Sequence, residues 1–128
     1  MKKVIYIAGP MSGLPDHNYA AFVMVARFLR SEGWEVRSPV EIASAIATPE
    51  QIDADRHVCR KVLDAERAVI RDECDAIYLL PNWETSSGAR MELAEAICDK
   101  LEIILHYDYV ANGFKYSPEK PELKGVVK

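Results

Sequence analysis

The sequence has few of the residues from which metal sites and disulfide frameworks are built. It contains three cysteines, Cys59, Cys74 and Cys98, which lie too far apart for the close pairs of a zinc site and cannot all form disulfides with one another. Three histidines are scattered along the chain without HxH or HExxH spacing. We therefore expect reduced thiols in a core, no metal ion and no other cofactor.

The chain also lacks a basic excess and a long hydrophobic run. Sixteen Lys and Arg stand against twenty Asp and Glu, which gives a net charge of −4. Duplex nucleic acids and anionic membranes are bound through clustered Lys and Arg, so we expect neither as a partner. The apolar run at residues 4–8 is too short for a signal peptide, and no stretch approaches the roughly 18 apolar residues of a membrane span. The sequence predicts a cytoplasmic protein.

What the chain does have is enough apolar sequence for one core. Hydrophobic residues make up 49% of its 128 positions, and this length is typical of a single domain. Short apolar runs predict strands at residues 4–8, 34–37, 76–80 and 102–105, and helical spacing predicts helices at 19–31, 50–73 (whole or broken) and 89–100. Residues 38–43 follow the second strand and lead into a segment that we expect to be irregular as far as Thr48 and Pro49.

Strands that alternate with helices predict parallel βαβ units. We therefore expect an α/β fold, with an open parallel sheet of four to five strands in a three-layer sandwich of the flavodoxin or Rossmann kind. The second strand has only two apolar residues and is expected nearer the sheet edge. Residues 1–106 would form the domain, and residues 107–128, rich in Tyr, Gly, Pro and Lys, would form a C-terminal arm.

The loop after the first strand is the first candidate for a binding site, because ligands of open parallel sheets bind at the carboxyl ends of the strands. Its sequence is AGPMSG at residues 8–13, where Gly9 and Gly13 permit close approach of a ligand and Ser12 offers a hydroxyl. The loop has neither the lysine of a Walker motif nor a GxGxxG pattern. A ligand-binding loop and a plain strand-to-helix turn are both open interpretations.

The loop after the third strand is the second candidate. It places Trp83 beside hydroxyl side chains at the start of a helix, which suits a ligand with a flat ring and a polar end. Glu92 follows about one turn into that helix, near its positive end. However, Glu92, Glu95 and Asp99 fall at i, i+3 and i+7, a spacing that is also typical of a solvated helix face.

Three segments in this order resemble the nucleoside 2-deoxyribosyltransferase superfamily: YIAGP at residues 6–10, CDAIYLL at 74–80 and SSGARMELAEA at 86–96. The resemblance runs from about Lys3 to Leu105. Within the superfamily, the sequence is similar in particular to a small phage-associated branch of uncharacterised domains and to deoxynucleoside 5′-monophosphate N-glycosidases. It implies cleavage of an N-glycosidic bond, or 2-deoxyribosyl transfer, on deoxynucleosides or their 5′-monophosphates through a covalent glycosyl-enzyme.

The resemblance also implies roles for individual residues. Glu92, in GARME at residues 88–92, would be the nucleophile, with Tyr6 beside it. Ser86 stands where the nucleotide glycosidases have a serine, which favours a 5′-nucleotide as substrate. The further substrate-binding residues would be Gly9, Pro10, Ser12, Gly13, Trp83, Gly88 and Ser117.

The chain departs from the superfamily at the position of the acid that protonates the leaving base. Arg67 stands there, and Asp64 or Glu66 would replace it; we take Asp64 as the candidate catalytic residue. Two alternatives follow, a non-catalytic nucleotide-binding module of the same fold and, from residues 83–88, a flavin-binding protein. In the superfamily a neighbouring subunit completes the pocket, which implies a homodimer or homotetramer and makes the arm at residues 107–128 an intersubunit or partly disordered segment.

Overall fold

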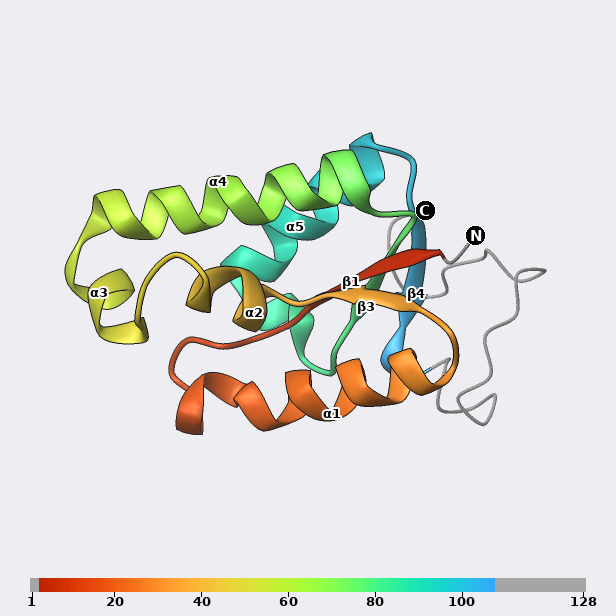
Figure 1. Cartoon of the computed structure of the whole chain (residues 1–128), viewed down its shortest axis with the longest axis horizontal. Coiled ribbons are helices and arrows are strands. Elements are labelled where there is room, and N and C mark those ends of the chain that lie inside the picture. Colours follow the sequence, from red (N-terminus) through yellow and green to blue (C-terminus); the bar gives the residue numbers. More distant parts are fainter. Residues whose placement is uncertain (1–2, 108–128) are drawn as a thin grey trace.

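A four-stranded parallel sheet forms the centre of the molecule (Figure 1). The computed structural model describes residues 3–107, so Ser117 and nearly all of the predicted C-terminal arm lie outside the described residues. The strands are β1 (Val4–Ala8), β2 (Glu35–Arg37), β3 (Ala76–Leu79) and β4 (Glu102–Leu105), in the spatial order β2-β1-β3-β4. Every neighbouring pair runs parallel, which confirms the predicted open α/β sheet and places β2 at an edge.

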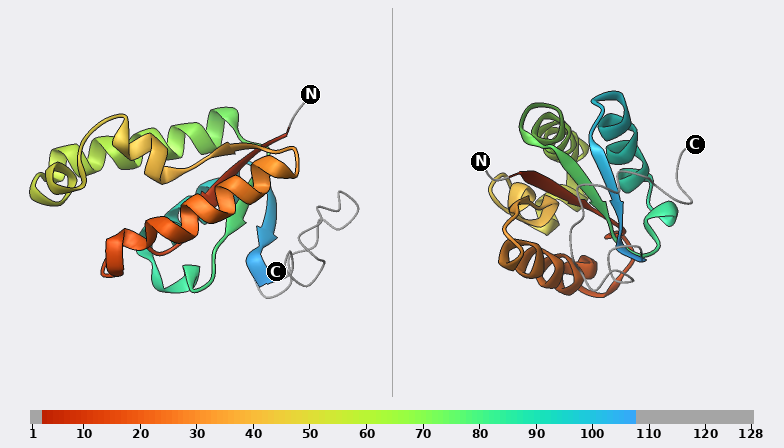
Figure 2. Two further views of the ribbon diagram at one scale, coloured as in Figure 1. Left: turned by 60° about the horizontal axis from the view of Figure 1, so that its bottom comes forward. Right: turned by 90° about the vertical axis from the view of Figure 1, so that its right-hand side faces the viewer.

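Helices cover both faces of this sheet (Figures 1 and 2). They are α1 (Tyr19–Ser31), α2 (Pro39–Ser44), α3 (Pro49–Ala54), α4 (Arg56–Glu73) and α5 (Ser87–Cys98), with short 3-10 turns η1 (Pro15–Asn18) and η2 (Trp83–Thr85). The side chains of β1 alternate between two apolar clusters: Ile5 and Ile7 pack with α1, whereas Tyr6 and Ala8 pack with α4 and α5. The sheet is therefore the middle layer of the predicted three-layer sandwich.

The segment after the second strand contains a helix that the sequence did not predict, α2, whereas residues 45–48 are irregular as expected. The hydroxyl of Ser38 accepts a hydrogen bond from the backbone N–H of Val40, and Pro39 stands at the first helical position. A serine cap followed by proline is a strong helix start, since proline has no N–H to leave unpaired there. The apolar period of this helix is too short for its pattern to predict it.

The helix predicted at residues 50–73 is broken. Asp55 has an extended backbone and separates α3 from α4, and its carboxylate accepts a hydrogen bond of 2.8 Å from the backbone N–H of His57. The long helix α4 therefore begins at a strong cap and sets its own rotational register. Within residues 3–107, no helix is both long enough and apolar enough to cross a lipid bilayer.

Candidate functional site

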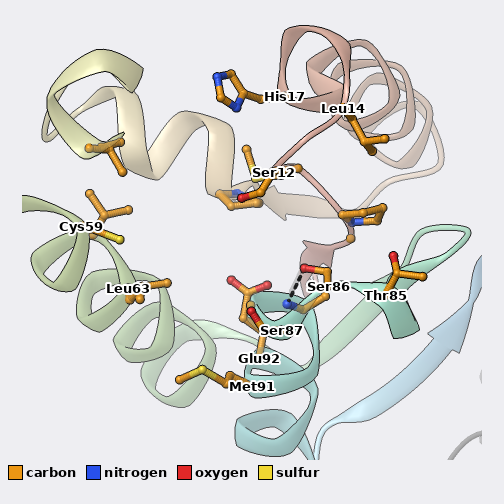
Figure 3. Close-up of a pocket in the computed structure, with 18 of the residues that line it drawn as sticks. Ser12, Leu14, His17, Cys59, Leu63, Thr85, Ser86, Ser87, Met91 and Glu92 are labelled. Carbon is orange, nitrogen blue, oxygen red and sulfur yellow. Dashed lines mark hydrogen bonds between the residues drawn. The ribbon is translucent and has the colours of Figure 1, made fainter. Parts of the chain in front are cut away.

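The carboxyl ends of the two central strands open onto a cavity. The chain leaves β1 toward β2 on one side of the sheet, and β3 lies on the other side of β1, so the strand order reverses between β1 and β3. Open parallel sheets bind ligands at such a point. A cavity of about 630 Å³ lies there, bounded by the loop after β1, the helices α3 and α4, and the segment from Asn82 into α5 (Figure 3).

Glu92 is buried and directs its carboxylate into this cavity (Figure 3). Only 7% of its surface is exposed, and its Oε2 accepts a hydrogen bond of 2.5 Å from the phenol of Tyr6, which is fully buried on β1. The spacing of Glu92, Glu95 and Asp99 was also compatible with a solvated helix face, but Glu92 does not lie on such a face. A buried carboxylate held by a phenol at the floor of a cavity is a typical arrangement for a catalytic group.

The start of α5 fixes the direction in which Glu92 points. The Oγ of Ser86 accepts a hydrogen bond of 3.1 Å from the backbone N–H of Ala89, so the helix begins immediately after Ser86. Ala89, Leu93 and Ala96 are buried against the sheet, and Glu92 lies on the same face of the helix. The cap that starts α5 thus turns Glu92 inward beside Tyr6.

A second buried carboxyl group contacts Glu92. Glu66, on α4, is 7% exposed, and its side chain is hydrogen-bonded to that of Glu92. Burial raises the pKa of Glu66 to about 7. Burial also raises the pKa of Glu92 well above its usual value, and the neighbouring charge of Glu66 adds to this effect, while the hydrogen bond from Tyr6 opposes it. The hydrogen bond between the two acids raises the pKa of Glu92 and lowers that of Glu66. The pKa of the Tyr6 phenol is likewise raised, first by burial and then by the charge of Glu92.

Several of the predicted binding residues meet at this cavity. Gly9, Pro10, Ser12, Ser86 and Gly88 line it together with Glu92. Gly9 also has a packing role, because a Cβ at this position would come within 2.7 Å of the Leu80 Cβ. By contrast, a Cβ at Gly88 would meet only the Ser86 Oγ, at 3.8 Å.

Other predicted residues lie elsewhere in the described part of the chain. Gly13 does not line the cavity, and its φ of +80° allows a turn that residues with a side chain rarely adopt. Trp83 is half-buried against the apolar cluster of α4 and α5 and does not line the cavity. Asp64 is exposed on α4, also outside the cavity wall. Of the two acids that the sequence offered on this helix, the structure brings Glu66 and not Asp64 to Glu92.

The wall formed by α3, α4 and η1 was missed by the sequence analysis. Ile52 and Asp53 from α3, Cys59 and Leu63 from α4, and His17 from η1 line the cavity. Only the apolar stripe of α4 gave any signal for this wall. Asp16, His17 and Asn18 all have positive φ angles, which no local pattern predicted. Within residues 3–107, no group of three or more side chains is placed to hold a metal ion.

Comparisons with solved structures agree with the resemblance seen in the sequence. The chain is similar to a 2-desoxiribosyltransferase from Leishmania mexicana, with 26% identity, a TM-score of 0.52, and coverage of 80% of this chain and 63% of that one. It thus spans less than two thirds of the Leishmania protein. It is also similar to the CMP N-glycosidase BcmB of Clostridium botulinum, with 26% identity, a TM-score of 0.49, and coverage of 87% and 79%. No curated protein matches the sequence.

A family model matches every residue that the structure describes. Its match extends over residues 3–107, and so includes the whole sheet, Tyr6, Glu66 and Glu92. The fold is shared with the Leishmania 2-desoxiribosyltransferase. The chain belongs to the family described as "Domain of unknown function (DUF4406)".

Proposed function

We propose that the protein cleaves the N-glycosidic bond of a deoxynucleoside or a deoxynucleoside 5′-monophosphate, with Glu92 as the nucleophile. One observation carries this proposal: the buried Glu92 carboxylate is held by the Tyr6 phenol at 2.5 Å and faces a cavity of about 630 Å³. The similarity to the Leishmania 2-desoxiribosyltransferase supports the same substrate class.

The first step transfers the sugar to the protein. A carboxylate oxygen of Glu92 attacks C1′, the C1′–N bond breaks, and its electron pair leaves with the base, which takes up a proton. The transition state resembles an oxocarbenium ion, so a carboxylate beneath C1′ stabilises it before the ester forms. The Tyr6 hydroxyl keeps the carboxylate in place for this attack.

The second step releases the sugar. A water oxygen attacks C1′, the ester C–O bond breaks, and its electron pair returns to the Glu92 carboxylate while water gives up a proton. A nitrogen of a second base in place of water gives transfer instead of hydrolysis. Both outcomes fall within the proposed function, and the acceptor decides between them.

The two sides of the cavity suit the two ends of such a substrate (Figure 3). Thr85, Ser86 and Ser87 lie where α5 begins, and hydroxyls with the free N–H groups of a helix start suit a 5′-hydroxyl or 5′-phosphate. The opposite wall carries Cys59 and Leu63, whose apolar surfaces suit a base. His17 and Asp53 also line the cavity and are the candidates to protonate the leaving base.

The test is release of free base from a panel of deoxynucleosides and their 5′-monophosphates, measured by chromatography with and without an added second base. We expect base release from at least one substrate and its loss in Glu92→Gln. The matched control is Glu84→Gln, at an exposed position outside the cavity wall, which should retain full activity. Tight nucleotide binding without turnover at stoichiometric protein would overturn the proposal in favour of a non-catalytic binding module.

A further inference from the structure

The apolar stripe of α4 contains one acid. Val62, Glu66 and Ile70 follow one another at intervals of four residues and are the buried positions of this helix. Val62 lines the cavity, whereas Ile70 is fully buried in the core cluster shared with α5. Glu66 lies between them, one turn below the cavity wall and outside the lining residues. It can therefore reach a ligand only through Glu92.

In the part of the chain that the structure describes, neither acid forms an ion pair with a positive charge. Two carboxylates that are buried and hydrogen-bonded to each other cannot both be ionised without a large cost, so such a pair retains one proton. The pair then carries one negative charge, as a nucleophile requires.

The other titratable groups around the pair do not supply a charge at neutral pH. From β1, Tyr6 has a raised pKa and stays neutral. At the end of α4, burial raises the pKa of the Cys74 thiol to about 12, so it is neutral as well. On the outer side of the α4–α5 contact, Arg67 binds Glu95. The carboxylates of the other helices that pack on α4 are remote or exposed: Glu41 of α2 binds Arg30, and Glu50 and Asp53 of α3 are exposed.

We propose that Glu66 is a positioning residue for Glu92: the two buried carboxyl groups share one proton in a hydrogen bond on the side of Glu92 away from the cavity, and this proton passes to Glu66 when Glu92 attacks. Together with the hydrogen bond from the Tyr6 hydroxyl, this bond fixes the direction of the Glu92 carboxyl group, and the pair carries a single negative charge. The inference rests on the proposed role of Glu92 as nucleophile, but the shared proton exists with or without substrate.

The first experiment needs no activity. Carboxyl carbons of glutamate are labelled with ¹³C, and the pH titrations of the wild type, Glu66→Gln and Glu92→Gln are followed by NMR. We expect Glu66 and Glu92 to titrate together in two steps above the usual glutamate range, and the remaining acid of each variant to titrate in one step. Asp72→Asn, which removes an exposed carboxylate of α4, should leave both curves unchanged. A Glu66 that titrates independently of residue 92 would overturn the inference.

The second experiment is the pH profile of base release. In Glu66→Gln the amide still donates to Glu92 but cannot lose a proton, so activity at neutral pH should stay within about tenfold of the wild type. The decline at alkaline pH, where the wild-type pair loses its last proton, should disappear. Glu66→Ala removes the donor and should lose about 100-fold, because the nucleophile is no longer held in place.

The two proposals fail in different ways. If Glu66→Gln folds normally by its thermal unfolding and is as inactive as Glu66→Ala, the positioning role is wrong even though Glu92 catalyses the reaction. If the NMR titrations are coupled but no substrate releases base, the shared proton stands and the proposed function fails. A Glu66→Gln variant that retains the alkaline decline of the wild type would also contradict the inference.

Discussion

The two faces of the sheet are buried to similar depths but contain different chemistry. On the α1 face, the core combines side chains such as Ile7, Phe22 and Leu29, and among residues 3–107 it contains no buried carboxylate. On the face covered by α4 and α5, the same sheet buries Glu66 and Glu92 beside apolar residues. Burial of uncompensated acids costs stability, so the α1 face supports the fold while the other face supports the site.

The largest effect is expected on the α4–α5 face, from Glu92→Gln. This variant should lose about 10³-fold or more in base release, because the amide cannot form the glycosyl ester. Its unfolding temperature should be equal to or above that of the wild type, since a buried acid has been removed. Chromatography and thermal unfolding measure the two quantities. A variant that unfolds before the assay temperature would contradict this division of roles.

On the α1 face, Leu29→Ala should have the opposite pattern. Leu29 is 1% exposed, and its truncation in a close-packed core should lower the free energy of unfolding by about 2–5 kcal/mol. Activity per folded molecule should be retained, because Leu29 lies on the face of the sheet away from Glu92. Urea unfolding and the base-release assay test this prediction. Normal stability combined with lost activity would show that the α1 face also serves the site.

The pH dependence of stability should come from the α4–α5 face. The folded-state pKa of Glu66 is raised from 4.5 to about 7, so the folded state binds this proton more tightly than the unfolded state does. The contribution of this proton to the free energy of unfolding is complete below pH 4.5. It falls by about 3 kcal/mol as the pH rises from 4.5 through 7. Urea unfolding at several pH values should show a smaller fall in Glu66→Gln than in the wild type and in Leu29→Ala. Equal falls in all three proteins would refute this assignment.

The smallest effect is expected from Tyr6→Phe, which removes one hydroxyl from the same face. The ring remains in the core, and Glu92 loses one hydrogen-bond donor. A hydrogen bond to a charged group contributes about 1.5–3 kcal/mol, so base release should fall by about 10- to 100-fold. The alkaline limb of the pH profile should persist, because Glu66 is unchanged. A rate equal to that of the wild type would show that the phenol does not position the nucleophile.

The sequence predicted the two central strands well because they are continuous apolar runs that end at Gly or Pro: β1 ends before Gly9, and the run that contains β3 ends before Pro81. The helix α1 was also predicted well, because its apolar period is unbroken over thirteen residues. The helix α2 was missed because its start depends on the Ser38 cap and Pro39, with only six residues to show a period. Local patterns that extend over several turns are visible in a sequence, whereas caps of short helices are easily taken for loops.

For the site, Glu92 became the candidate nucleophile through the resemblance of the GARME segment to the superfamily, because its spacing alone also fits a solvated helix face. The sequence could not decide between Asp64 and Glu66. Residues two positions apart on a helix point about 200° away from each other, so only one of the two acids can face Glu92, and which one depends on how the helix is rotated. The register of α4 depends on its start at Asp55, and only packing against α5 shows which side faces inward. The same reason explains why Cys59 and Leu63 were missed as part of the cavity wall.

The central claim, that Glu92 is the nucleophile, is tested most directly by mass spectrometry of the acid-quenched protein after brief incubation with deoxynucleosides and their 5′-monophosphates. The account predicts a mass increase equal to the sugar or sugar phosphate, located on the peptide that contains Glu92 and absent in Glu92→Gln. Undiminished base release by Glu92→Gln, or an adduct on another residue, would contradict it.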